Sequence, residues 1–79
     1  MEGTYVNSKD NKLVLKVLKS EFFLISGFYG SVIIKDKQIE LADKGFGTAV
    51  GTISRNQLIF EGKEPNDLAK NIVGTWEKE

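Results

Sequence analysis

Turn-forming residues interrupt this chain about every ten residues, and this spacing limits the fold more than any other feature. Short runs rich in apolar and β-branched side chains lie between the interruptions. The expected strands are Thr4–Val6, Lys12–Leu18, Phe22–Ser26, Ser31–Lys35, Gln38–Ala42, Thr48–Ser54, Gln57–Glu61 and Gly74–Lys78. Because the connections are short, successive strands should be antiparallel neighbours. The sequence therefore predicts an all-β fold, an up-and-down antiparallel meander curled into a small barrel or half-barrel.

Residues 66–73 are the one segment with helical character. Asn66 or Asp67 offers a cap, and Leu68 and Ile72 fall on the same side of a helix, four residues apart. Such a helix has two turns at most and depends on packing for its stability. We expect at most one short helix there, with an irregular loop as the alternative.

Length and charge limit the classes of partner. Seventy-nine residues make one domain, spanning 1–79. The 11 basic and 11 acidic residues are scattered, so no basic excess is present to neutralise phosphates, and no nucleic-acid partner is expected. No apolar run approaches the length of a membrane span. The N-terminus lacks signal-peptide features. The chain is then either a cytoplasmic protein that begins at Met1 or an exported or lipid-anchored domain whose leader has been removed.

The chain contains neither cysteine nor histidine. Ser-His and Cys-His catalysis and the commonest metal ligands are therefore excluded within it. Most carboxylates fall at expected turns or strand ends, and the pattern drives no carboxylate pair inward. We expect no enzymatic activity, no cofactor and no metal. The oxygen-rich segments 7–11 and 65–67 match no EF-hand spacing, and turn chemistry explains them more simply.

The two hairpins in the middle of the chain have definite expected registers. A turn at 36–37 pairs Ile34 with Ile39 and Val32 with Leu41, which places all four on one face.

A turn at 55–56 pairs Ile53 with Leu58 and sets Phe60 opposite Gly51. A glycine facing an aromatic ring leaves room for the ring and lets the strand curve. We therefore interpret the repeated Gly-Thr steps as bending points of a small sheet, with the general abundance of glycine and threonine in β-proteins as the alternative.

The hairpin over residues 12–26 is apolar on both faces. Three aliphatic residues face inward in either of two registers: Leu13, Leu15 and Val17. A two-residue turn at 19–20 adds Phe22 and Leu24 to this face, whereas a three-residue turn adds Phe23 and Ile25 instead. A strand pair that faces water on one side should be polar there. The second face therefore needs a cover.

That second face supplies a candidate interaction surface. Its residues are Val14, Leu18, Phe23, Ile25, Phe28 and Tyr29. Phe28 and Tyr29 are expected in a glycine-hinged turn, where aromatic side chains suit a contact. A second copy, a foreign protein or the segment 63–73 are the three alternatives for the cover. We expect Val14 and Leu18 to be at least half shielded.

Trp76, in the last expected strand, has two interpretations. It stacks on a ligand, or it closes the barrel against the first strand near Tyr5. An eight-stranded lumen is just wide enough to be filled by side chains. The expected filling residues are Leu13, Leu15, Val17, Ile34, Ile39, Leu41, Ile53, Leu58, Phe60 and Trp76.

The order of these features resembles a known family. The opening EGTYVNSKDNKLVLKV is followed by a hairpin, GSVIIKDKQIELA, VGTISRNQLIFEG and a closing IVGTWEKE. This order resembles the small lipocalin-like domains of bacterial lipoproteins, which implies an up-and-down sheet curled into a barrel or half-barrel and no shared reaction. The chain is shorter than most such domains and lacks their leader with its acylated cysteine, so the resemblance does not by itself imply export. Its Gly-Thr-Trp motif is similar to that of larger ligand-binding calycins, but there the motif typically opens the barrel and here it closes the chain, so no ligand residues are carried across.

We therefore expect a non-catalytic binding or interaction module that acts through protein–protein contact, with a foreign protein or a second copy as its partner. One alternative is a carrier of a small apolar ligand in a lipocalin-like cavity. The other is a small inhibitor from a mobile element that binds a host enzyme.

Overall fold

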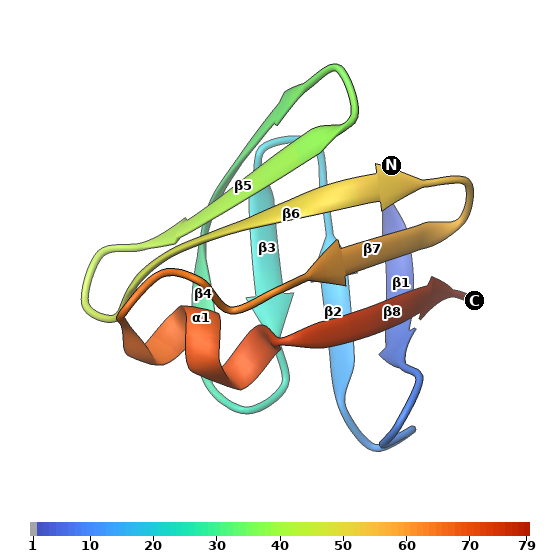
Figure 1. Ribbon diagram of the computed structural model, residues 1–79, viewed down its shortest axis with the longest axis horizontal. Helices are drawn as coiled ribbons and strands as arrows, with labels where there is room; N and C mark the ends of the chain where they lie inside the picture. Colours follow the sequence, from blue (N-terminus) through green and yellow to red (C-terminus); the bar gives the residue numbers. More distant parts are fainter. Residues whose placement is uncertain (1) are drawn as a thin grey trace.

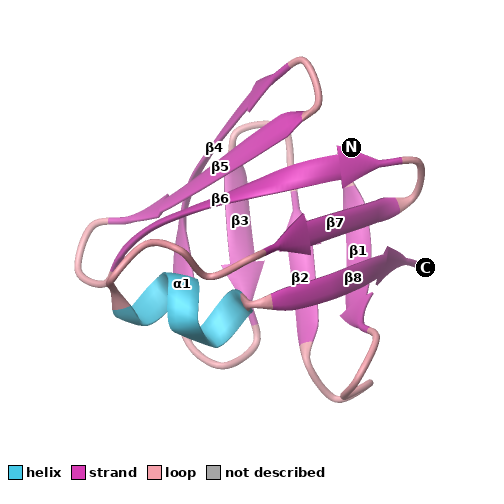
Figure 2. Ribbon diagram, viewed as in Figure 1, coloured by secondary structure: helices cyan, strands magenta, loops and turns pink. Residues whose placement is uncertain are grey.

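Eight antiparallel strands close into a barrel in the computed structural model, which describes residues 2–79 (Figures 1 and 2). The strands are β1 (Gly3–Asn7), β2 (Val14–Val17), β3 (Glu21–Leu24), β4 (Phe28–Lys35), β5 (Gln38–Asp43), β6 (Gly47–Ser54), β7 (Gln57–Phe60) and β8 (Gly74–Lys78). Each strand pairs with the next, and β8 returns to pair with β1. The prediction of an all-β, up-and-down barrel is confirmed.

Strand β4 joins the two layers of the barrel. In Figure 1, β1–β3 form a rear layer, and β5–β8 form a front layer that crosses it steeply. The first half of β4 pairs with β3 as far as Ser31, and the second half pairs with β5 from Ser31 onward. Gly30 lies at this bend, where an added Cβ would collide with the carbonyl oxygen of Ala42. The bend therefore requires glycine.

The predicted registers of the hairpins are confirmed. Ile34 lies opposite Ile39 and Val32 opposite Leu41, as expected for a turn at 36–37. For the first hairpin, the structure selects the two-residue turn at 19–20, because Val17 lies opposite Phe22 and Leu15 opposite Leu24. Those four side chains are buried.

The predicted pairing of Phe60 with Gly51 is also confirmed. A Cβ at Gly51 would lie 2.7 Å from Cε1 of Phe60, so the ring occupies the space that a side chain would need. Both residues are buried. This pair shows how one Gly-Thr step lets a short sheet coil around an aromatic side chain.

The helix α1 (Asp67–Ile72) forms where the sequence predicts it. The side chain of Asn66 caps it by accepting a hydrogen bond from the backbone N–H of Ala69. Its buried residues Leu68, Ala69 and Ile72 join the core, so the helix packs against the barrel beside β6. Burial of this apolar side stabilises a helix too short to persist alone.

Most of the predicted lumen residues are buried, but two differ. Ile34 is 39% exposed, and Leu13 is only partly buried. Ile34 has the inward parity of its neighbours, but the hairpin of β4 and β5 projects beyond the rest of the barrel (Figure 1), so no opposing layer covers it. The prediction that Ile34 fills the lumen is therefore wrong.

The prediction of a glycine-hinged turn over residues 27–30 is also wrong. The turn ends at Gly27, and Phe28 begins β4. Phe28 and Tyr29 lie opposite Leu24 and Phe23 in the ladder with β3. Alternation along a strand then sends these two aromatic side chains to opposite faces.

Candidate interaction surface

Strand pairing arranges the outward-facing residues of β1–β4 in three rows. The central row crosses the four strands through Thr4, Lys16, Phe23 and Tyr29. The row on one side comprises Val6, Val14 and Ile25, since Ile25 donates its backbone N–H to the carbonyl of Val14. The row on the other side comprises Leu18, Glu21 and Ser31. We call the surface formed by these three rows the outer face.

Four large apolar side chains on the outer face are exposed. Leu18 is 45% exposed, Phe23 46%, Ile25 65% and Tyr29 66%. The rings of Phe23 and Tyr29 are stacked, with centroids 6.2 Å apart. Cross-strand aromatic contact holds both rings in place on the sheet, so the patch is preformed.

Two of the sequence-predicted surface residues lie elsewhere or are partly covered. Phe28 points inward, is half-buried against the core and makes an edge-on contact with Phe46, with ring centroids 5.2 Å apart. Phe28 therefore lies on the face of the sheet opposite to the outer face, because it is the first residue of β4 and not part of a turn. Val14 faces outward and is partly buried between its neighbours on the sheet.

The segment 63–73 does not cover the outer face, so that alternative is wrong. Its helical residues Leu68, Ala69 and Ile72 enter the core beside β6. Leu18 is shielded over only slightly more than half of its surface, and Ile25 and Tyr29 are shielded over less than half. Asn66 holds the segment on the opposite layer through two hydrogen bonds. Its Oδ1 accepts one from the backbone N–H of Ala69, and its Nδ2 donates one to the carbonyl of Thr48 at 2.9 Å.

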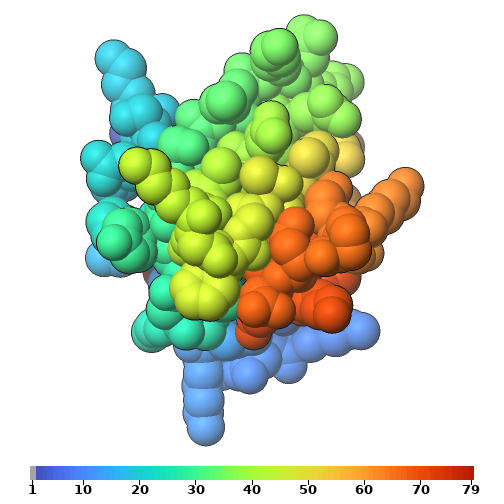
Figure 3. All heavy atoms as spheres, turned by 90° about the vertical axis from the view of Figure 1, so that its left-hand side faces the viewer, coloured from blue at the N-terminus to red at the C-terminus, as the bar shows by residue number. Residues whose placement is uncertain are grey.

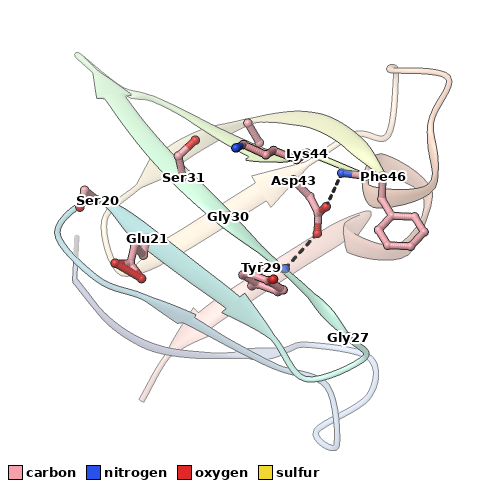
Figure 4. Close-up of a pocket in the computed structure, with 11 residues that line it drawn as sticks. Ser20, Glu21, Gly27, Tyr29, Gly30, Ser31, Asp43, Lys44 and Phe46 are labelled. Atoms are coloured by element: carbon pink, nitrogen blue, oxygen red, sulfur yellow. Dashed lines mark hydrogen bonds between the residues drawn. The ribbon is translucent and has the colours of Figure 1, made fainter.

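A groove of about 720 Å³ borders the outer face at the bend of β4. Glu21, Tyr29 and Ser31 belong to both the outer face and the groove. The end of β5 at Asp43 and the following loop with Phe46 form the far wall (Figure 4). In Figure 3, the atoms of this loop, in yellow-green, lie between those of β3 and β4 and those of the helix, in orange. The groove is thus continuous with the outer face.

Asp43 links β4 to the end of β5 beside the groove, where the two strands separate. Its Oδ2 accepts a hydrogen bond from the backbone N–H of Tyr29 at 3.1 Å, and its Oδ1 accepts one from Gly45 at 2.9 Å. Tyr29 lies beyond the ladder with β5, which begins at Ser31. The carboxylate therefore replaces a strand partner for this edge N–H group.

Trp76 and Tyr5 lie inside the barrel. Trp76 is fully buried and Tyr5 is 1% exposed, on the two strands that close the barrel. Phe22 and Phe60 belong to the same core cluster and are also buried, so side chains fill the interior. Burial raises the pKa of the Tyr5 phenol above its ordinary value. Glu61 is not among the residues that line the groove. Its pKa is lowered by a hydrogen bond from Lys63 and by the charge of that lysine, whose Nζ lies 2.8 Å from Oε1 of Glu61.

Comparison with protein-family models, with curated proteins and with solved structures found no match. Within residues 2–79, no three or more acidic residues are grouped so that they could hold a metal ion. The same part of the chain contains no helix long and apolar enough to span a bilayer.

Sequence reasoning missed Phe46 and the groove. Phe46 follows Lys44 and Gly45 in a loop, and nothing in its local pattern indicates that its ring packs on Phe28 or that it is 47% exposed. The bend of β4 creates the groove. The one sequence signal for the bend is Gly30, within a run that otherwise favours strand.

Proposed function

We propose that this protein is a non-catalytic binding module that acts through protein–protein contact over its outer face. The observation that carries the proposal is the shared exposure of Phe23, Ile25 and Tyr29 on one preformed sheet surface. Aromatic anchors of this kind dominate the energetics of protein interfaces. A contiguous exposed apolar patch on a soluble domain is typical of an interaction site.

The filled interior favours a function that acts through the protein surface rather than through a ligand bound in the lumen. Trp76, Phe22 and Phe60 occupy the space that a lipocalin-like cavity would leave open. The groove at the bend of β4 lies on the outside. The resemblance to small lipocalin-like domains enters this proposal as a likeness of strand order and turn spacing, and it adds no ligand.

Photo-crosslinking in the cells that produce the protein tests the proposal. We replace Phe23 with p-benzoyl-L-phenylalanine and compare the products with those of the same replacement at Thr52, which is exposed on β6. We expect a discrete protein adduct from position 23 and none of the same mass from position 52. Mass spectrometry then identifies the captured chain.

The same adducts from both positions, or no adduct from position 23, would contradict the proposal. Circular dichroism confirms that both labelled proteins keep the fold, which makes the two positions a matched pair.

A further inference from the structure

We infer that the outer face binds the outer face of a second copy of this chain, in a two-fold symmetric dimer. This inference rests on the proposed function and names its partner. It is carried by the placement of one cation and one anion, Lys16 and Glu21, around the exposed apolar residues of the outer face.

The register fixes where these charges lie. Lys16 lies directly opposite Phe23, and Glu21 lies two residues before Phe23 on the same face of β3. Both charged residues are exposed. Within residues 2–79, neither side chain forms an ion pair with another group. Each is therefore available to a partner.

The grid of the sheet shows that the outer face is complementary to itself. Neighbouring strands lie about 4.8 Å apart, and residues i and i+2 lie about 7 Å apart along a strand. On this grid, we draw the line in the plane of the sheet that is equidistant from Lys16 and Glu21. This line passes within about 2 Å of the positions of Leu18, Phe23 and Tyr29. Three exposed apolar residues thus mark one diagonal, with opposite charges on either side of it.

A two-fold axis along that diagonal joins two copies face to face. The rotation brings Phe23 onto Phe23 of the other copy and sets Lys16 of each copy against Glu21 of the other. Such an isologous contact repeats every pairing twice. An apolar centre with opposite charges at its flanks has the composition of a specific interface.

The groove completes the match. The same rotation carries Ile25, the most exposed aliphatic side chain on the outer face, past β4 to the groove of the other copy, beside Ser31 and Asp43. Association brings no net charge repulsion, because the 11 basic and 11 acidic residues balance.

Sedimentation velocity of the purified full chain tests the inference. Between about 10 µM and 500 µM, we expect the mass to rise from 8.8 kDa toward twice that value. K16E and E21K each place like charges in contact twice, so each should weaken the dimer at least about tenfold. The double variant K16E/E21K restores both pairs and should recover affinity to within about threefold.

Matched controls separate local pairing from net charge. K35E changes the net charge as K16E does, and E40K changes it as E21K does. Lys35 and Glu40 are both exposed on the projecting hairpin of β4 and β5. Both controls should leave dimerisation within about twofold of wild type. I25S should weaken the dimer while preserving the circular dichroism spectrum.

Three results would overturn the inference: a monomer across the whole range, a dimer indifferent to both single charge changes, or a folded double variant that stays monomeric. A monomer that is crosslinked from position 23 to a foreign protein would remove the second copy as the partner and leave the proposed function standing. A monomer that gives no adduct would remove both.

Discussion

The indole Nε1 of Trp76 donates a hydrogen bond to the carbonyl oxygen of Ile72, 2.8 Å away inside the protein. Ile72 ends the helix α1, and Trp76 lies in β8, the strand that closes the barrel. This bond satisfies a carbonyl at the helix end that has no partner within the helix. It therefore ties the position of α1 to the closure of the barrel.

Trp76→Phe should destabilise the protein by about 2–4 kcal/mol, because it removes this bond and leaves a cavity in the core. Urea unfolding followed by far-ultraviolet circular dichroism measures the change. Ile33→Ala is the control. Because Ile33 is 51% exposed, this substitution should lower the free energy of unfolding by less than about 1 kcal/mol. Equal losses from the two variants would contradict the burial of Trp76.

Gly51→Ala should cost about 1–3 kcal/mol, because the new methyl group overlaps the Phe60 ring. Gly45→Ala provides the matched control. Its nearest neighbour would be Oδ1 of Asp43 at 3.7 Å, so the change should stay within about 0.5 kcal/mol. Adding Phe60→Leu to Gly51→Ala should recover part of the loss, and strictly additive losses would show that the two residues do not touch.

Asn66→Ala should destabilise the protein by about 1–2 kcal/mol. It removes the acceptor of the hydrogen bond from the backbone N–H of Ala69 and the donor of the hydrogen bond to the carbonyl of Thr48. Asn66→Asp keeps the acceptor and loses the donor, so its loss should be intermediate. Asn71→Ala is the control. Asn71 is exposed, and its side chain donates a hydrogen bond to the carbonyl of Asp67 within the same helix. Chemical denaturation curves rank the three variants, and a loss for Asn71→Ala that matches Asn66→Ala would refute this account.

Alkaline pH should weaken the fold through Tyr5. Burial raises the pKa of its phenol above the ordinary value of 10.0, so the unfolded chain loses this proton at lower pH than the native protein does. The unfolded state then binds fewer protons above pH 10, and stability falls as pH rises through that range. Below the unfolded pKa, both states keep the proton and the contribution of Tyr5 is constant.

Comparison with Tyr5→Phe isolates this effect, because the lysines titrate in both proteins. The wild-type urea midpoint should fall more steeply than that of Tyr5→Phe between about pH 10 and pH 11.5. Parallel slopes for the two proteins would contradict the raised pKa.

The short turns and alternating apolar residues of the sequence were enough to predict the meander, the registers of the hairpins that turn at 36–37 and 55–56, and the place of the one short helix. The register of the first hairpin stayed open between two turn lengths, and an irregular loop remained the alternative to the helix. These features depend on neighbours close in the chain, as when the turn at 36–37 sets Ile34 opposite Ile39. The apolar second face of the first hairpin was also visible in the sequence, because Phe23 and Ile25 have outward parity once the turn length is chosen.

The tertiary structure alone decided which of these residues are covered. Ile34 has inward parity but is exposed, because the hairpin that carries it extends past the opposing layer. Phe28 turned inward because β4 begins at that residue and bends at Gly30 to join the two layers. The groove follows from that bend, and the helix entered the core instead of covering the outer face. Each of these outcomes depends on contacts between segments distant in the chain, which a local pattern of residues does not encode.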